Sequence, residues 1–282
     1  MTTALSKALL AAPLLSLALL APPAVAQAAP DAEPSADQNL DNAESPFRFE
    51  LYTWVWVMGL DGTVGARGRT TDVDASFGDI LDASDSVFAF SGRMELGYGK
   101  FAGYIDGMYA DLGVDDVRGP EGLETFDISF EQTILDFGLM YRIVDHKPTG
   151  KAAANPRNLT LDLYGGGRYS GLELTVDPSS EPARSADKNW VDPIFGAKLT
   201  APLAEHWHLM VNGDIGGFGA ASDFTWSTTA VIGYDFLLFK HPSSVMLGYR
   251  AIGWDYTDGS GDSEFTWDII QHGVILGFSM EF

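Results

Sequence analysis

The sequence lacks cysteine altogether, and it has few basic residues. Lysine and arginine number 17 against 39 aspartates and glutamates, which gives 282 residues a formal net charge of −22. The absence of cysteine excludes a disulfide framework, a thiolate metal site and a cysteine nucleophile. The acidic excess argues against a nucleic-acid partner, because binding phosphate requires a basic face. Charged residues make up 20% of the chain, whereas glycine reaches 31 residues and aromatics 12%, a composition that favours a β-rich protein.

Long hydrophobic runs are also missing beyond residue 30, so the sequence predicts no transmembrane helix there. The N-terminus differs: Lys7 precedes an apolar run over 8–20, and Ala24-Val25-Ala26 forms a small-x-small cleavage site. This layout predicts a secretory signal peptide over 1–26 rather than a membrane helix, for which the run is short. Residues 27–45 are acidic and poor in large apolar side chains, which predicts a disordered periplasmic leader.

The rest of the chain, residues 46–282, alternates between apolar and polar residues with a period of two. In the first run Leu51 and Val55 share one face, while Glu50 and Tyr52 share the other. Such alternation is typical of β-strands with two different faces. Ten runs follow this pattern, at 47–57, 87–98, 101–112, 126–143, 158–174, 190–200, 207–217, 224–236, 244–256 and 265–282.

The connectors between these runs tend to alternate in length. Those at 58–86, 113–125 and 175–189 are long, whereas Gly99-Lys100 and 201–206 are short. Dyad-patterned strands joined alternately by short turns and longer loops are typical of an outer-membrane β-barrel. We therefore predict an all-β chain that forms a transmembrane, antiparallel up-and-down barrel of about ten strands, within a range of eight to twelve. Such a sheet must close, because an open edge would leave unpaired backbone groups in lipid.

The last strand carries a further signal. Phe278, Met280 and Phe282 fall on one face of it, and the run ends in phenylalanine. This pattern resembles the signal that bacterial barrel proteins present to their assembly machinery, which is therefore an expected partner.

The region from Pro46 onward also resembles an uncharacterised family of bacterial outer-membrane barrel proteins, small monomeric porin-like barrels. The resemblance implies a monomer in the outer membrane, in contact with membrane lipid and lipopolysaccharide, and it implies no assigned chemistry. The segments that carry it are 59–63, 73–81, 167–169, 190–197, 214–219 and 247–250.

The face opposite the apolar one carries charges of both signs, six basic and six acidic. We predict that these twelve residues line the lumen: Arg48, Glu50, Arg93, Glu95, Asp106, Asp136, Arg142, Asp162, Arg168, Lys198, Asp214 and Arg250. Unpaired charges in a narrow lumen are costly, so we expect them to pair across strands. Two hypotheses follow, a salt-bridged plug and a narrow cation-preferring pore. Aromatic residues near the short turns are expected to form a girdle at the membrane surface: Tyr98, Phe101, Tyr141, Trp207, Tyr234, Phe236 and Phe282.

The acidic excess falls in the predicted outer loops. Asp258, Asp262 and Glu264 alternate oxygen ligands and form a weak candidate for a divalent cation, whereas the acidic loops are better explained as a solvated rim. No other cofactor is expected.

The first long loop contains Phe77, Asp79, Ile80 and Leu81, a mixed apolar and acidic segment. It is predicted to form a short helical turn. The turn could constrict the barrel mouth or pack against its rim, and the sequence does not choose between them.

Catalysis would need a base beside a nucleophile or an activated water. None of the five histidines lies in a predicted outer loop, and Gly-x-Ser-x-Gly is absent. We therefore assign no catalytic residue and expect no enzyme. The alternatives left open are a lipid-modifying barrel enzyme, a surface-exposed adhesion or ligand-binding barrel and, at the level of the fold, a soluble periplasmic β-sandwich.

Overall fold

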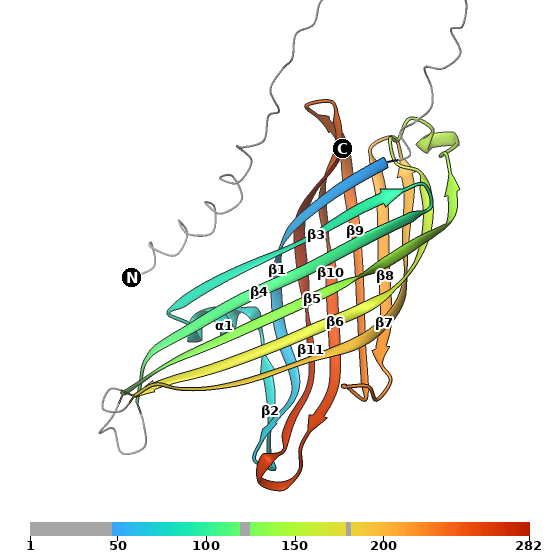
Figure 1. Ribbon diagram of the computed structural model, residues 1–282. Coiled ribbons are helices and arrows are strands. Elements are labelled where there is room, and N and C mark those ends of the chain that lie inside the picture. The colour runs from blue at the N-terminus through green and yellow to red at the C-terminus, as the bar shows by residue number, and fades with distance from the viewer. Residues whose placement is uncertain (1–46, 119–124, 179–181) are drawn as a thin grey trace, which may run out of the picture. The chain divides into compact units, whose positions relative to one another are not determined.

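The computed structural model describes residues 47–118, 125–178 and 182–282, so the predicted signal peptide and leader lie outside it. Nearly all of the described chain is β-strand (Figure 1). The strands are β1 (Phe47–Ala66), β2 (Arg69–Ala75), β3 (Ser86–Tyr98), β4 (Phe101–Arg118), β5 (Thr125–His146), β6 (Leu159–Pro178), β7 (Arg184–Ala204), β8 (Trp207–Gly217), β9 (Phe224–Leu238), β10 (His241–Asp258) and β11 (Phe265–Glu281). The helical segments are α1 (Phe77–Ala83), η3 (Gly150–Ala152) and η4 (Gly261–Ser263).

Ten of these strands, β1 and β3 to β11, close into an antiparallel barrel. The first and last strands of the barrel pair from Glu50↔Glu281 to Ala66↔Phe265, which leaves no open edge along that seam. This confirms the predicted all-β barrel of about ten strands. One end of the barrel, here called the turn end, has the short turns 99–100, 205–206 and 239–240. The opposite end is called the loop end.

Strand β2 is additional to the barrel, and it corrects the prediction that 58–86 is one long loop. Strand β1 continues to Ala66, turns through Arg67 and Gly68, and returns as β2. Both turn residues have positive φ, 55° and 67°, as the two-residue hairpin turn that matches strand twist requires. Glycine adopts this conformation without steric cost. The hairpin was missed because its residues are mostly polar and glycine-rich.

The predicted helical turn is present as α1. Ser76 caps it, because the Ser76 side chain accepts from the Asp79 backbone N–H and the Asp79 carboxylate accepts from the Ser76 backbone. Phe77, Ile80 and Leu81 are half-buried, and Asp79 is exposed. The helix packs against β1 and β2.

The strands separate into two arms towards the loop end. Strand β1 pairs with β3 only as far as Trp54↔Ser91, and β7 pairs with β8 only from Ile194 onward to the turn end. Beyond these points β3 to β7 form one arm, and β10, β11, β1 and β2 form the other (Figure 1).

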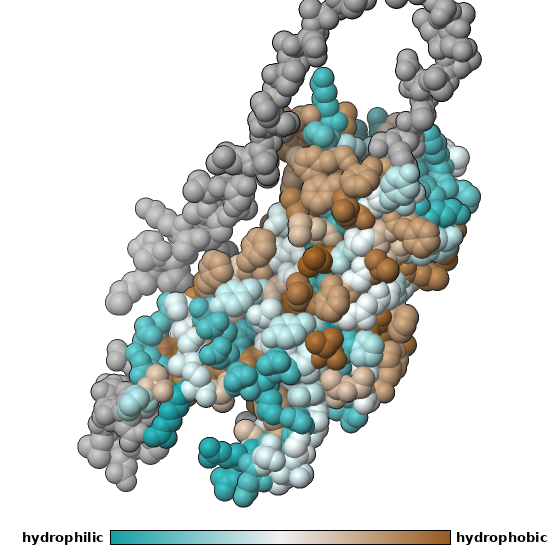
Figure 2. Space-filling model, in the orientation of Figure 1, coloured by the Kyte–Doolittle hydropathy of each residue, from teal (hydrophilic) through white to brown (hydrophobic). Residues whose placement is uncertain are grey.

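The outside of the barrel is apolar and the inside is packed. Outward side chains such as Leu139, Phe195 and Leu276 are 72%, 64% and 56% exposed. Figure 2 shows hydrophobic side chains gathered over the middle of the barrel and hydrophilic ones at the tips of the lower strands. A surface of this kind is stable against lipid and would aggregate in water. No helix among the described residues is both long and apolar enough to traverse a membrane.

Aromatic residues encircle the turn end, where a girdle was expected. Ring centroids lie 5.0 Å apart in Phe101–Tyr141 and 5.2 Å apart in Trp207–Tyr234. Tyr98 is 66% exposed. Side chains of this kind prefer the boundary between lipid and water.

Candidate functional site

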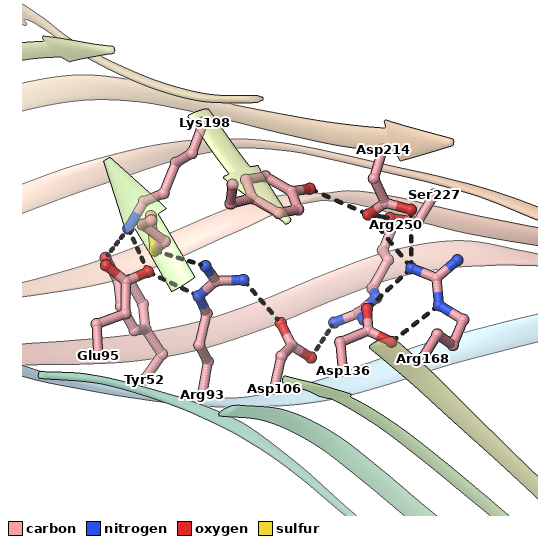
Figure 3. A network of polar contacts seen from close by, with 12 residues as sticks. Tyr52, Arg93, Glu95, Asp106, Asp136, Arg168, Lys198, Asp214, Ser227 and Arg250 are labelled. Atoms are coloured by element: carbon pink, nitrogen blue, oxygen red, sulfur yellow. Dashed lines mark hydrogen bonds and ion pairs between the residues drawn. The ribbon is translucent and has the colours of Figure 1, made fainter. Parts of the chain in front are cut away.

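The twelve charged residues predicted for the lumen all lie on the inner faces of their strands, because strand alternation turns their apolar neighbours outward. Most of them converge in one network of polar contacts (Figure 3). The network has two groups, which together contain side chains from eight of the ten barrel strands, β3 to β10.

The first group is a chain of alternating charges that crosses the lumen twice. Lys198 on β7 donates to Glu95 on β3 at 2.6 Å. Arg93 donates to Glu95 at 2.7 Å and to Asp106 at 3.4 Å. Arg250 on β10 donates to Asp106 on β4 at 3.0 Å. Since β7 and β10 are not neighbours of β3 and β4 in the sheet, both contacts span the inside of the barrel.

The second group is centred on Arg168, which has no exposed surface. Its guanidinium donates two hydrogen bonds of 2.8 Å to Asp136 and one of 3.0 Å to Asp214. Asp214 also accepts from the hydroxyls of Tyr164 and Ser227, at 3.0 and 2.5 Å. Both carboxylates are therefore held by a shared cation, and Asp214 is also held by two neutral donors.

The charges of the two groups cancel. The cations are Lys198, Arg93, Arg250 and Arg168, and the anions are Glu95, Asp106, Asp136 and Asp214; all eight residues are buried. Buried charges are tolerated only when they are paired and hydrogen-bonded. The one-to-one balance meets that condition without a bound ion.

A third cluster closes the turn end, and sequence reasoning missed its centre. Arg157 belongs to the connector 147–158 yet is buried, donating to Glu50 at 2.7 Å, Asp235 at 3.0 Å and Ser279 at 3.0 Å. Asp235 also bonds His208. The connector shows no strand alternation, so the sequence alone leaves the direction of the Arg157 side chain undetermined.

The other predicted lumen residues lie near the same end. Arg142 donates to Asp162 at 2.8 Å, and Arg48 donates to the Gly99 carbonyl at 2.6 Å. These contacts fix side chains at the border between the lumen and the short turns.

An apolar layer fills the lumen on the loop-end side of the charges. The rings of Trp190 and Tyr256 stack with centroids 4.1 Å apart, and Gln271 donates to Gln132 at 2.6 Å across the barrel. Ile252 is completely buried in the same cluster. The period-two pattern could not reveal this layer, since inward and outward residues are both apolar there.

The packing beside the charged network leaves little space. A cavity of about 20 Å³ lies beside Tyr52, Trp54 and Arg250. This volume holds about one water molecule. The side chains beside the charged network therefore leave room at this cavity for about one water molecule.

The remaining predicted site residues lie elsewhere. The residues of α1 sit beside the wall, where β1 and β3 part, and not in the buried clusters of the lumen. Phe278 and Phe282 face outward, as do the side chains beside them on the neighbouring strands. Met280 belongs to the same face but is only 6% exposed.

Asp258 of the candidate cation site accepts a hydrogen bond of 2.6 Å from Lys188. Both residues lie at the loop-end tips of their strands, beyond the apolar band, and this contact lowers the pKa of the Asp258 carboxyl. Within the described ranges no three acidic or histidine side chains are arranged to hold a metal ion.

Comparison with known proteins gives matches at the level of structure only. No family model and no curated protein matches the chain. The attachment invasion locus protein Ail of Yersinia pestis, solved with the heparin analogue sucrose octasulfate, is 9% identical with a TM-score of 0.36, over 84% of this chain and 98% of that one. The translocator domain of autotransporter NalP from Neisseria meningitidis is 15% identical with a TM-score of 0.38, over 86% and 91%. Neisserial surface protein A is 11% identical with a TM-score of 0.27, over 84% and 98%. At these values the likeness is one of β-barrel fold alone.

Proposed function

We propose that this chain is an integral outer-membrane protein whose barrel is closed to ions and serves as a membrane-anchored scaffold. The observation that carries the proposal is the pair of contacts that cross the lumen, Lys198–Glu95 and Arg250–Asp106. The barrel wall holds the protein in lipid, and the strands at the loop end form the surface that is available for binding.

A closed lumen is favoured over the narrow cation-preferring pore for an energetic reason. An ion that crosses the network has to displace partners from buried charges, and breaking one such pair costs several kcal/mol. The apolar layer around Trp190 and Ile252 adds a second barrier, since it offers few polar atoms to a dehydrated ion.

The orientation follows from the ends of the barrel. Short turns face the periplasm in barrels of this type, and the longer segments face outward. The turn end then faces the periplasm and the two arms face the exterior. Contact with lipopolysaccharide, engagement of the assembly machinery and a monomeric state stay predictions.

The first test is conductance in a planar bilayer. The full chain, expressed with its N-terminal segment and purified from membranes, is expected to insert without producing current steps. Folding is checked by the shift in electrophoretic migration on heating. Stable, cation-selective steps from the folded protein would show that the lumen is a pore.

A second test separates a plug from a constriction by α1. Replacement of 76–84 by a glycine-serine linker of equal length removes the helix while leaving β2 and every lumen residue in place. We expect the variant to remain non-conducting, because wall residues and the connector 147–158 close the lumen. Current steps in this variant alone would assign the closure to α1.

A lipid-modifying enzyme is the alternative class. Buried His208 is bonded to Asp235, and His272 lies between Tyr249 and Asp61 on the outer surface. Among the described residues neither imidazole is hydrogen-bonded to a serine hydroxyl. The expectation that the chain is not an enzyme stays a prediction, which an activity screen on lipid A and phospholipid tests.

A further inference from the structure

The two arms enclose a cleft at the loop end, here called the vestibule. Its volume is about 710 Å³, and its apolar lining consists of Val64, Phe130, Leu172, Leu174, Phe265 and Trp267. Figures 1 and 2 show the hairpin tips of β1–β2 and β10–β11 standing apart from the β3–β7 arm. The volume is in the range of small-molecule sites, which are about 300–1,000 Å³.

The vestibule has a closed floor. Phe130 and Trp267 stack across it with ring centroids 6.4 Å apart, and the Gln132–Gln271 hydrogen bond lies further in, two residues along β5 and four along β11. On one side Lys188 and Asp258 join the arms. On the other side β2 and the loop-end half of β3 are not paired with each other, so no strand joins the arms there. It is a cleft with a packed floor.

The apolar lining is unusual for its place. Leu174 is 43% exposed, and Phe265 is only partly covered. The tips of the surrounding strands are polar, as Figure 2 shows. Apolar surface left open among polar residues marks a binding site more often than a packing accident.

The rim supplies a charge that is free to bind. Arg69 lies opposite Ala66 on β1 and so faces the vestibule, and Arg67 lies in the turn beside it. Neither arginine forms an ion pair within the part of the chain that the structure describes, and the carboxylates of Asp262 and Glu264 on the same rim are not bonded to them. Lys188, by contrast, is engaged by Asp258. A guanidinium binds a carboxylate through two parallel hydrogen bonds.

We infer that the vestibule binds a single-chain amphiphile with a carboxylate head, its hydrocarbon chain against Leu174 and Phe265 and its head at Arg69. The inference rests on the proposed function only for the side of the membrane that the vestibule faces. A fatty acid is the simplest ligand of this chemistry.

The test uses palmitate with a photoactivatable diazirine on its chain, added to the full chain reconstituted in phosphatidylcholine vesicles. We expect peptide mass spectrometry to find label around Leu174 and Phe265. Label confined to outward residues such as Leu139 would mean that palmitate only partitions into the bilayer, and this would overturn the inference.

Matched variants sharpen the result. Ala186→Trp fills the cleft and should abolish the vestibule label, whereas Ser185→Trp places the same bulk on the outer face of β7 and should leave it unchanged. Equal labelling in both variants would contradict the site.

The head group is tested by competition. Unlabelled palmitate should compete better than hexadecanol, and hexadecyltrimethylammonium should compete least. Arg69→Gln should weaken palmitate competition about tenfold, the loss expected for one charged hydrogen-bonding pair. Preference for the cationic amphiphile would overturn the assigned head group. Current steps with binding intact would overturn only the closed lumen, and absent labelling with a closed lumen would overturn only the vestibule site.

Discussion

Replacing Arg168 with methionine is expected to remove about 3–5 kcal/mol from the free energy of unfolding. Methionine keeps most of the volume but leaves Asp136 and Asp214 buried without their shared cation. Urea unfolding of the protein in lipid vesicles, followed by tryptophan fluorescence, measures the loss. The heat-dependent shift in migration confirms that the starting material is folded.

The control removes the two unpaired carboxylate charges together with the cation. In the variant Arg168→Met with Asp136→Asn and Asp214→Asn, we expect most of the stability to return, since a neutral set costs far less to bury. If the single variant is as stable as the wild type, the ion pairs do not hold the lumen together. If the triple variant is no better than the single one, packing rather than charge explains the loss.

The barrel itself could be predicted from the sequence because strand alternation is a local signal. Glu95 and Asp106 point inward for the same reason that Leu96 and Ile105 point outward, and this needs no knowledge of partners. Strand alternation therefore predicts that the twelve charged side chains point into the lumen, although it cannot predict which charges pair. Pairing depends on how strands far apart in sequence face each other, as Lys198 and Glu95 do.

Features without strand alternation could not be predicted. Arg157 enters the lumen from a connector, and the polar β1–β2 hairpin extends beyond the membrane, where an apolar face is no longer required. The vestibule could not be predicted from the sequence for a related reason. Leu174 and Phe265 are ordinary strand residues in sequence, and only the parting of the arms leaves them exposed around one cleft.

The two layers of the lumen suit a scaffold whose ends are functionally separate. The charged layer ties β3 and β4 to β7 and β10, and the apolar layer covers it on the side of the vestibule. A ligand in the vestibule therefore meets a floor of packed side chains rather than an aqueous passage. Truncating the side chains that form this floor should lower the stability of the barrel, because the same side chains pack opposite walls of the lumen together.

Gly273→Val is expected to prevent closure of the barrel. A Cβ atom at position 273 would lie only 1.8 Å from the Val57 backbone carbonyl oxygen, at the Met58↔Gly273 position of the β1–β11 seam. The obstacle is backbone, so a side-chain rotation cannot relieve it. We expect a cost above the ~1–3 kcal/mol of ordinary overpacking and loss of most of the folded fraction in heat-modifiability assays.

Gly103→Val is the matched control for the seam. It makes the same change on β4, where the nearest atom, the Gly138 carbonyl oxygen, is 3.9 Å from the added Cβ and the side chain faces outward. This variant should fold like the wild type, since valine suits a lipid-facing strand. Equal folding of both variants would show that β1 and β11 do not approach as closely as the register requires. Equal failure of both would point to a general intolerance of valine, whereas loss in Gly273→Val alone identifies the seam as the step on which closure depends.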